Sequence, residues 1–354
     1  MDKDYKKFFQ DLVLAPSPSG FEQPAQEAYR NYVKDLADEV KTDVHGNVIA
    51  LKKGTGKLRF MVSGHADEIG LMIKYIDKEG FIRFSPIGGV DTTLLPGLRV
   101  NVYHNKKVVR GVIGRKPIHL LPMAERGKAP KMSDLWIDIG AKDKKAAEKR
   151  VSIGDHITFS PGMETLSKDI ITTKATDNKV GVFIVGAILK ELENEKIAAN
   201  IYSVSSVQEE IGLRGAITSA YGIDPHVGIA IDVTHATDYP GMNKNELGDV
   251  QMGLGPTVAV GANINPKVFE LLKKAAGNAK VKYQIEAAPR GTGTDANAIQ
   301  TTRAGVAAGL ISIPNRYMHT PNEVISLKDL QSAVVLLAEF ARLIDDNTDF
   351  IPKA

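Results

Sequence analysis

The sequence contains no cysteine, which excludes disulfide bonds and any metal site built on thiolate ligands. Long apolar runs are also missing, and none approaches the ~20 residues that span a bilayer. The segment Met1–Tyr5 is charged and has no apolar core of the kind found in signal peptides. We therefore expect a soluble protein with no membrane partner. The absence of cysteine fits a reducing compartment, and we predict a cytoplasmic location.

The chain has almost no excess of charge of either sign. Lys and Arg together number 45 and Asp and Glu 42, so the formal net charge is +3. Such a small excess gives no reason to expect nucleic acid or an anionic membrane as a partner. The 354 residues are enough for one large domain or two modest ones.

Two adjacent carboxylates, Glu209 and Glu210, follow an apolar run from Ile201 to Val207 and precede Gly212. This pattern predicts a buried strand of the parallel type that ends in a turn and then a helix. Ligands of open α/β sheets bind beyond the carboxyl ends of the strands. Because two acids are costly to bury without a partner, a cation is the simplest partner, and a solvated pair in a loop is the alternative.

Histidine and acidic side chains of the kinds that bind metals, here called metal-type residues, occur at four other places. Each place is a transition from a predicted strand to a loop or from a loop to a helix. They are His65 with Asp67, Asp177 before a helix, Asp232, and His319. One such residue alone is more often a helix cap or a core residue than a ligand. Their recurrence at the ends of apolar strands indicates one shared site. Histidine and carboxylate ligands without thiolate suit zinc, cobalt or manganese.

Short strands dominate the block from Gly70 to about Leu166, whereas helices and strands alternate on both sides of it. The frequent turns of this block predict a small β-barrel or sandwich. Metal-type residues occur before and after the block, so both flanks must meet in space. We therefore predict a discontinuous α/β domain, residues 1–69 plus 167–354, with residues 70–166 as an inserted β-rich domain.

Apolar periodicity, caps and turn residues predict the elements of the α/β flanks. Helices are expected at residues 5–14, 24–37, 180–193, 214–221, 266–276 and 327–344. Residues 40–51 are expected to form a hairpin, and further strands are expected at 58–63, 201–207, 227–231, 281–286 and 305–313.

The glycine-rich run Gly291–Thr294 lacks the lysine of a phosphate-binding loop and the full dinucleotide spacing. We interpret it as a loop that lines a substrate pocket. Asp295 beside it, and Glu68 after the His-x-Asp pattern, are candidates to hold a substrate amine, because carboxylates favour a nearby cation. Three histidines of the β-rich block have no acid cluster beside them and are interpreted as surface or core residues: His104, His119 and His156.

A family resemblance rests on the order of the motifs His-x-Asp, Asp-Asn, Glu-Glu, Asp and His along the chain. It also rests on three local segments, Ser63–Gly70, Gln208–Gly212 and Arg316–Pro321. The chain resembles the co-catalytic dimetal peptidases of clan MH, and within them the TET-type aminopeptidase family. That family includes deblocking and glutamyl aminopeptidases, and some members are labelled endoglucanases. The resemblance covers nearly the whole chain and shows no departure at a metal-binding position.

The resemblance implies two divalent metal ions per subunit, with zinc or cobalt favoured and manganese an alternative. Asp177 would bridge the two ions. Glu210 and His319 would bind one ion, and His65 and Asp232 the other. The implied fold is a phosphorylase/hydrolase-like α/β metallopeptidase domain that carries the small inserted β-barrel.

Two further residues receive roles from the resemblance. Asp67 would accept the free ring N–H of His65 and orient it. Glu209 would be the general base, taking a proton from a metal-bridging water and returning it to the leaving amine. The implied activity is removal of the N-terminal residue from short peptides. The implied assembly is a homo-oligomer, a tetrahedral shell of twelve subunits, with the insert in its contacts.

Three alternatives stay open from the residues alone. A deacylase or carboxypeptidase of the same clan would use the same metals. An endoglucanase would need two carboxylates ~5–9.5 Å apart across a sugar, whereas Glu209 and Glu210 are adjacent in sequence. A non-catalytic scaffold would have lost the base or several ligands, and all are present.

Overall fold

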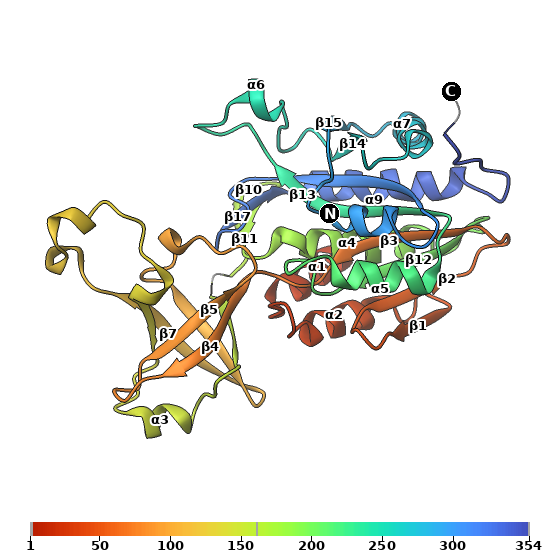
Figure 1. The fold of residues 1–354 in the computed structure, drawn as a ribbon. Helices are drawn as coiled ribbons and strands as arrows, with labels where there is room; N and C mark the ends of the chain where they lie inside the picture. The colour runs from red at the N-terminus through yellow and green to blue at the C-terminus, as the bar shows by residue number, and fades with distance from the viewer. Residues whose placement is uncertain (1–2, 161, 353–354) are drawn as a thin grey trace.

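The computed structural model describes residues 3–160 and 162–352, which form a large α/β body with a β-barrel attached at one side (Figure 1). Met1 and Asp2 of the charged N-terminal stretch, Pro161 of the predicted insert, and Lys353 and Ala354 lie outside the described residues. Among the helices of the described part, none is both long and apolar enough to cross a membrane.

One eight-stranded sheet forms the centre of the body. Its four inner strands run parallel, and their apolar side chains are covered on both faces, as expected for parallel strands. Their carboxyl ends therefore meet at one edge of the sheet. In spatial order the strands are β1 (Glu39–Thr42), β2 (Val48–Lys52), β12 (Asn200–Ser206), β3 (Arg59–His65), β13 (Val227–His235), β16 (Ala307–Asn315), β14 (Thr257–Gly261) and β15 (Gln284–Ala288).

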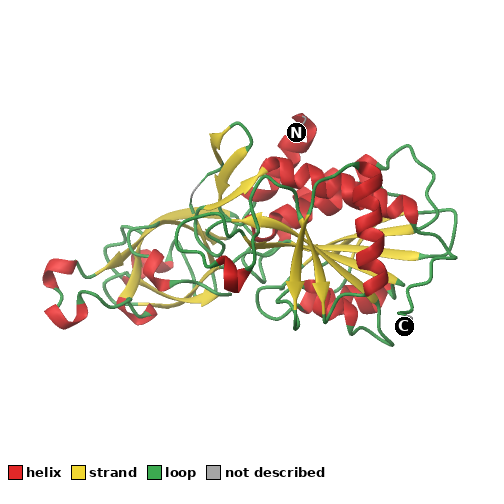
Figure 2. Cartoon of the chain, turned by 90° about the horizontal axis from the view of Figure 1, so that it is seen from above, coloured by secondary structure: helices red, strands yellow, loops and turns green. Residues whose placement is uncertain are grey.

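Helices cover both faces of this sheet (Figure 2). On one face lie α1 (Lys3–Leu14), α2 (Gln23–Val33), α4 (Thr176–Glu191), α7 (Pro266–Ala279) and α9 (Leu327–Leu343). On the other lie α5 (Arg214–Ile223) and α8 (Asp295–Gln300), while the short α6 (Lys244–Leu247) sits in the loop after β13. The α4 helix is apolar nearly all round because it packs between the sheet and other helices.

The predicted insert contains a closed six-stranded barrel with its own apolar core. Around the barrel the order is β4 (Gly70–Ile76), β5 (Ile82–Ile87), β8 (Leu135–Asp138), β7 (Lys107–Arg115), β6 (Arg99–His104) and β9 (His156–Phe159). The helix α3 (Lys144–Glu148) and single turns of 3₁₀-helix lie in its connections. The prediction of an α/β fold with an inserted small β-barrel is confirmed.

A three-stranded sheet lies beside the barrel, formed by β10 (Glu164–Ser167), β11 (Ile170–Thr173) and β17 (Glu323–Ser326). Its first strand starts inside the range that the sequence assigned to the insert, yet it pairs through β11 with a strand from the end of the chain. The last barrel strand ends at Phe159. The barrel is therefore slightly shorter than the predicted 70–166.

The three histidines of the insert have structural surroundings. His104 Nδ1 lies 2.9 Å from Asp155 Oδ2, and the His156 ring stacks on Phe21 with centroids 5.2 Å apart. His119 is exposed in the long connection after β7. These contacts agree with the interpretation of all three as surface or core residues, although His104 does have one acidic partner.

Candidate active site

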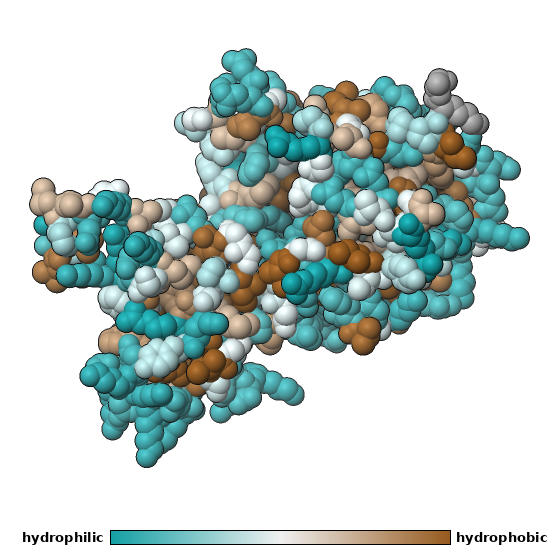
Figure 3. Space-filling view, viewed as in Figure 1, coloured by the Kyte–Doolittle hydropathy of each residue, from teal (hydrophilic) through white to brown (hydrophobic). Residues whose placement is uncertain are grey.

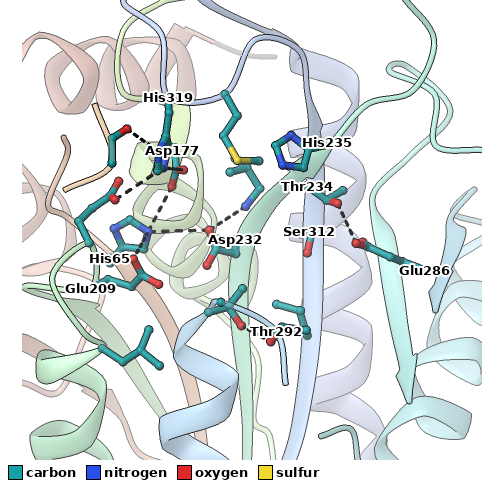
Figure 4. Close-up of a pocket in the computed structure, with 18 residues that line it drawn as sticks. His65, Asp177, Glu209, Asp232, Thr234, His235, Glu286, Thr292, Ser312 and His319 are labelled. Carbon is teal, nitrogen blue, oxygen red and sulfur yellow. Dashed lines mark hydrogen bonds and ion pairs between the residues drawn. The ribbon is translucent and has the colours of Figure 1, made fainter. Parts of the chain in front are cut away.

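The metal-type residues of the sequence meet at the carboxyl edge of the parallel strands, in a cavity of about 550 Å³ (Figure 4). Each arrives from a different element. His65 is the last residue of β3, Asp232 lies in β13, Glu209 and Glu210 follow β12, Asp177 lies in the first turn of α4, and His319 follows β16. The strand and helix ends thus bring these six side chains into one cavity.

Hydrogen bonds of the Asn178 side chain and a close glycine–glycine approach hold the start of α4 against the sheet. Asn178 donates its side-chain N–H to the carbonyl of Ile231, 2.7 Å away, and accepts from the N–H of Gly181. A Cβ on Gly64 would lie only 2.4 Å from the carbonyl carbon of Gly181, so glycine is required for β3 and α4 to approach this closely. Asp177 is thereby placed beside the ends of β3 and β13.

Asp177 lies between the two histidines. Its Oδ1 is 3.3 Å from His65 Nε2, and its Oδ2 is 3.2 Å from His319 Nε2. A further acid lies near the same nitrogen of each histidine: Asp232 Oδ1 is 3.8 Å from His65 Nε2, and Glu210 Oε2 is 3.6 Å from His319 Nε2. A carboxylate with each oxygen facing a different histidine has the arrangement needed to bridge two cations.

Two groups of three side chains have ligand atoms within 4.8 Å of one another. They are His65, Glu209 and Asp232, and Asp177, Glu210 and His319. Histidine nitrogens with carboxylate oxygens form a donor set that suits a divalent transition metal. These groups are therefore candidates to hold two metal ions.

The electrostatics of the cluster also favour bound cations. Burial raises the pKa of Glu209 and of Glu210 to about 8, and repulsion from neighbouring carboxylates adds to the rise. Burial likewise raises the pKa of Asp232 well above its usual range. Glu210 Oε1 is buried without a hydrogen-bond partner. Buried carboxylates and an unpaired acceptor are the features that a bound divalent ion would stabilise.

Each histidine turns its other ring nitrogen toward a backbone carbonyl. His65 Nδ1 lies 3.1 Å from the carbonyl of Asp67, and His319 Nδ1 lies 3.0 Å from the carbonyl of Gly89. An N–H on Nδ1 in both rings leaves Nε2 free to bind a metal. Gly89 belongs to the inserted block, so the insert helps to orient a residue of the site.

The Asp67 carboxylate contacts more groups than the His65 ring that the sequence assigned to it. Its Oδ1 lies 3.4 Å from His65 Nδ1, while the closer acceptor for that ring is the Asp67 carbonyl. The two carboxylate oxygens accept the backbone N–H groups of Glu209 and Glu210, at 3.0 and 3.1 Å, and the hydroxyl of Ser19. Asp67 therefore orients the turn that presents both glutamates.

The expectation that Asp295 and Glu68 hold a substrate amine is wrong, because neither side chain lines the cavity. Asp295 is 2% exposed and accepts hydrogen bonds from the hydroxyls of Ser63 and Ser206. Glu68 is buried and pairs with Lys174 Nζ at 2.6 Å. Asp295 is therefore bound by two serines, and Glu68 by a lysine. The glycine-rich loop before Asp295 does line the cavity, as predicted.

Glu323 is a buried acid of the site that no sequence pattern singles out. Its carboxylate accepts the backbone N–H of Asp177 at 3.0 Å and that of His319 at 2.9 Å, and also the hydroxyl of Thr176. One side chain therefore fixes the backbone of the central acid and of a histidine. It is the first residue of β17, two positions after Pro321, where no periodic pattern marks it.

Comparison with known proteins identifies the group to which this geometry belongs. The sequence profile described as M42 glutamyl aminopeptidase matches residues 46–336. The chain belongs to the M42 family. The resemblance drawn from the three local segments is thus confirmed, and the chain is a peptidase of a metal-dependent family.

Three members of this M42 group show the extent of the similarity. A lysyl aminopeptidase from Pyrococcus furiosus is 38% identical, over 92% of this chain and 93% of the relative. The TET aminopeptidase structure from Thaumarchaeota archaeon SCGC AB-539-E09 has a TM-score of 0.92 and 33% identity, covering 97% of both chains. The Pyrococcus horikoshii TET1 peptidase has a TM-score of 0.85 and 30% identity, covering 96% of this chain and 100% of that one.

We predict that Glu323→Gln weakens metal retention by roughly 10–100-fold, the cost typical of losing a group that orients a ligand. The amide keeps one acceptor oxygen. Its NH₂ group, however, would face N–H donors that in the wild type donate to a carboxylate oxygen. Competition with a fluorescent chelator measures the affinity. Glu164→Gln, an exposed site on β10, is the control. Equal affinity in the wild type and both variants would contradict the role assigned to Glu323.

Proposed function

We propose that this M42 peptidase is an aminopeptidase that uses two divalent metal ions, zinc or cobalt by preference, with manganese as the alternative. Its substrates would be short peptides, hydrolysed at the N-terminal peptide bond. The observation that carries the proposal is the position of Asp177, whose two oxygens face His65 and His319 at 3.3 and 3.2 Å.

The ligand sets follow from sharing Asp177. His65, Asp177 and Asp232 would hold one ion, and His319, Asp177 and Glu210 the other. With Asp177 shared, each set has three residues, and we assign Glu209, whose Oε2 lies 3.7 Å from His65 Nε2, to proton transfer and not to an ion. Bound ions in these positions would acidify the attacking water and polarise the scissile carbonyl.

Glu209 is the group that we propose as general base. It takes a proton from the water that attacks the peptide carbonyl and gives it to the nitrogen of the leaving amine. Without bound cations, burial raises its pKa to about 8, so it binds a proton more readily than an exposed glutamate does. The backbone N–H of Glu209 is fixed by Asp67, so the carboxylate starts from a defined position.

The cavity is suited to a substrate with a free N-terminus. Of its described lining residues, none is lysine or arginine, and five are acids. No positive side chain of this lining therefore repels the ammonium group of an unblocked peptide, and acetylation removes that charge. This supports exopeptidase action rather than cleavage within a chain.

We also propose a homo-oligomer, a tetrahedral shell of twelve subunits in the cytoplasm, with the β-barrel in its contacts. The TET1 peptidase of Pyrococcus horikoshii can assemble into a tetrahedron or a large octahedral shell. Figure 3 shows the barrel as a separate lobe with apolar residues among hydrophilic ones on its surface. Exposed apolar side chains of this lobe include Val108, Val112, Ile118, Leu120 and Met123.

The reaction is tested with a short peptide, its N-acetylated form and protein reloaded with zinc or cobalt after chelation. We expect about two ions per chain by metal analysis. Mass spectrometry over time should show the free peptide shortening one residue at a time from its N-terminus, while the acetylated form persists. Internal fragments, or shortening from the C-terminus, would contradict the proposal.

The division of roles is tested by two substitutions at adjacent positions. Glu209→Gln keeps size and removes basicity, so turnover should fall by roughly 10²–10⁴-fold with metal content retained. Glu210→Gln should instead lower metal affinity, and excess metal should restore part of its activity. Metal titration and turnover are measured on both variants. Indistinguishable behaviour of the two would show that the roles are assigned wrongly.

The assembly is tested by light scattering on the purified protein at micromolar concentration. We expect a mass close to that of twelve chains. Charged replacements at Leu120 and Met123 in the barrel should shift the population to smaller species, because these exposed apolar side chains lose their contacts. A monomer with full activity would overturn the proposed shell.

A further inference from the structure

Glu286 is the acid of the cavity that lies outside the two metal-type groups. It comes from β15, at the edge of the sheet, and its half-buried side chain reaches the cavity across from His65 (Figure 4). Its Oε1 accepts the hydroxyl of Thr234 at 2.8 Å, and its Oε2 accepts the hydroxyl of Thr257 at 2.7 Å. Two threonines, one from β13 and one from β14, thus hold the carboxylate in one orientation.

The charge of this carboxylate is not balanced by its donors. Both donors are neutral hydroxyls, and no lysine or arginine belongs to the described lining of the cavity. A carboxylate offers about four lone-pair sites, so two remain for a further donor. A cation with several N–H donors would use the remaining lone pairs and balance the negative charge of this partly buried carboxylate.

The strand register sets the separation between Glu286 and the metal-type cluster. Thr234 stands two residues beyond Asp232 on β13, on the same face and about 6.6 Å along the strand. Asp232 pairs with Ser312 of β16, which pairs in turn with Thr257 of β14. The carboxylate is therefore separated from the cluster by roughly the length of a long side chain.

The walls between the two ends suit an aliphatic stem. Half-buried Met318 lines the same cavity and supplies apolar surface, whereas the side chains of Val233 and Leu310 belong to the hydrophobic cores below it. Lysine and arginine bury their methylene groups against such surface while their charged ends bind elsewhere. An apolar stretch between a reaction centre and an unbalanced carboxylate matches those two side chains.

We propose that Glu286 ends the subsite for the side chain of the substrate's first residue, and that this subsite selects lysine and arginine. The inference rests on the proposed aminopeptidase function and adds the substrate class to it. The α-amine of the same residue must lie beside the scissile bond, at the metal-type cluster, so Glu286 is left for the side chain. Glu286 is thus a specificity-determining residue.

The test compares Lys, Arg, norleucine and Glu aminoacyl coumarin amides on the zinc- or cobalt-loaded wild type and on Glu286→Gln. Norleucine matches the lysine stem without its charge. We expect the wild type to have the highest kcat/KM for Lys and Arg. In the variant the Lys-to-norleucine ratio of kcat/KM should fall by roughly 10–100-fold, the range expected for losing a hydrogen bond between charged groups.

Two further variants make the comparison specific. Glu286→Asp keeps the charge with a shorter reach and should give an intermediate ratio. Glu270→Gln removes an exposed glutamate of α7 that pairs with Lys273, and it should keep the wild-type ratio. A wild type that prefers norleucine or Glu overturns the inference. An equal loss on all substrates in Glu286→Gln also overturns it, because Glu286 would then serve the α-amine.

Failure of the proposed function is distinguishable from failure of this subsite. If no aminoacyl substrate is cleaved, the aminopeptidase proposal fails, and calorimetric binding of lysinamide and norleucinamide then decides the subsite. Tighter binding of lysinamide to the wild type, lost in Glu286→Gln, supports the cationic subsite. Equal binding of the two amides to the wild type overturns it.

Discussion

The structure depends on keeping several carboxylates together at one edge of a sheet, with two histidines as their neighbours. Asp177, Glu209, Glu210 and Asp232 are all buried or nearly so. Burial raises the pKa of three of them, while the two histidines hold the pKa of Asp177 below its usual range despite its burial. Such a cluster keeps all its carboxylates charged at neutral pH only where cations compensate them, and two groups of its side chains are candidates to bind such ions.

The surrounding fold serves to hold that cluster in position. Asp67 fixes the turn of the two glutamates, and Glu323 fixes the backbone of Asp177 and His319. The inserted barrel also takes part, since the Gly89 carbonyl lies beside the His319 ring. The insert is thus connected to the chemistry as well as to the proposed assembly.

Much of this arrangement could be predicted from the sequence, for a physical reason. Parallel strands bring their carboxyl ends to one edge, so His65, Asp232 and the Glu209–Glu210 pair had to converge once their strands were recognised. The closed barrel was also predictable, because its alternating strands and turns differ from the flanks. Both inferences rest on periodicity, which the sequence carries directly.

The remaining features depend on which way side chains point. Asp295 and Glu68 stand next to the site in sequence but turn into the interior, where serines and a lysine bind them. Glu286 enters the cavity only because β14, a strand that the sequence did not reveal, brings Thr257 alongside it. Glu323 contacts Asp177 across 146 residues of chain. No local pattern records contacts of this kind.

The central claim is that Asp177 bridges two ions held by the flanking histidines. Crystals of the protein loaded with zinc, measured on both sides of the zinc absorption edge, test it most directly. We expect two anomalous peaks, one beside His65 and Asp232 and the other beside His319 and Glu210, with Asp177 between them. A single peak, or peaks that do not touch Asp177, would contradict this account of the site.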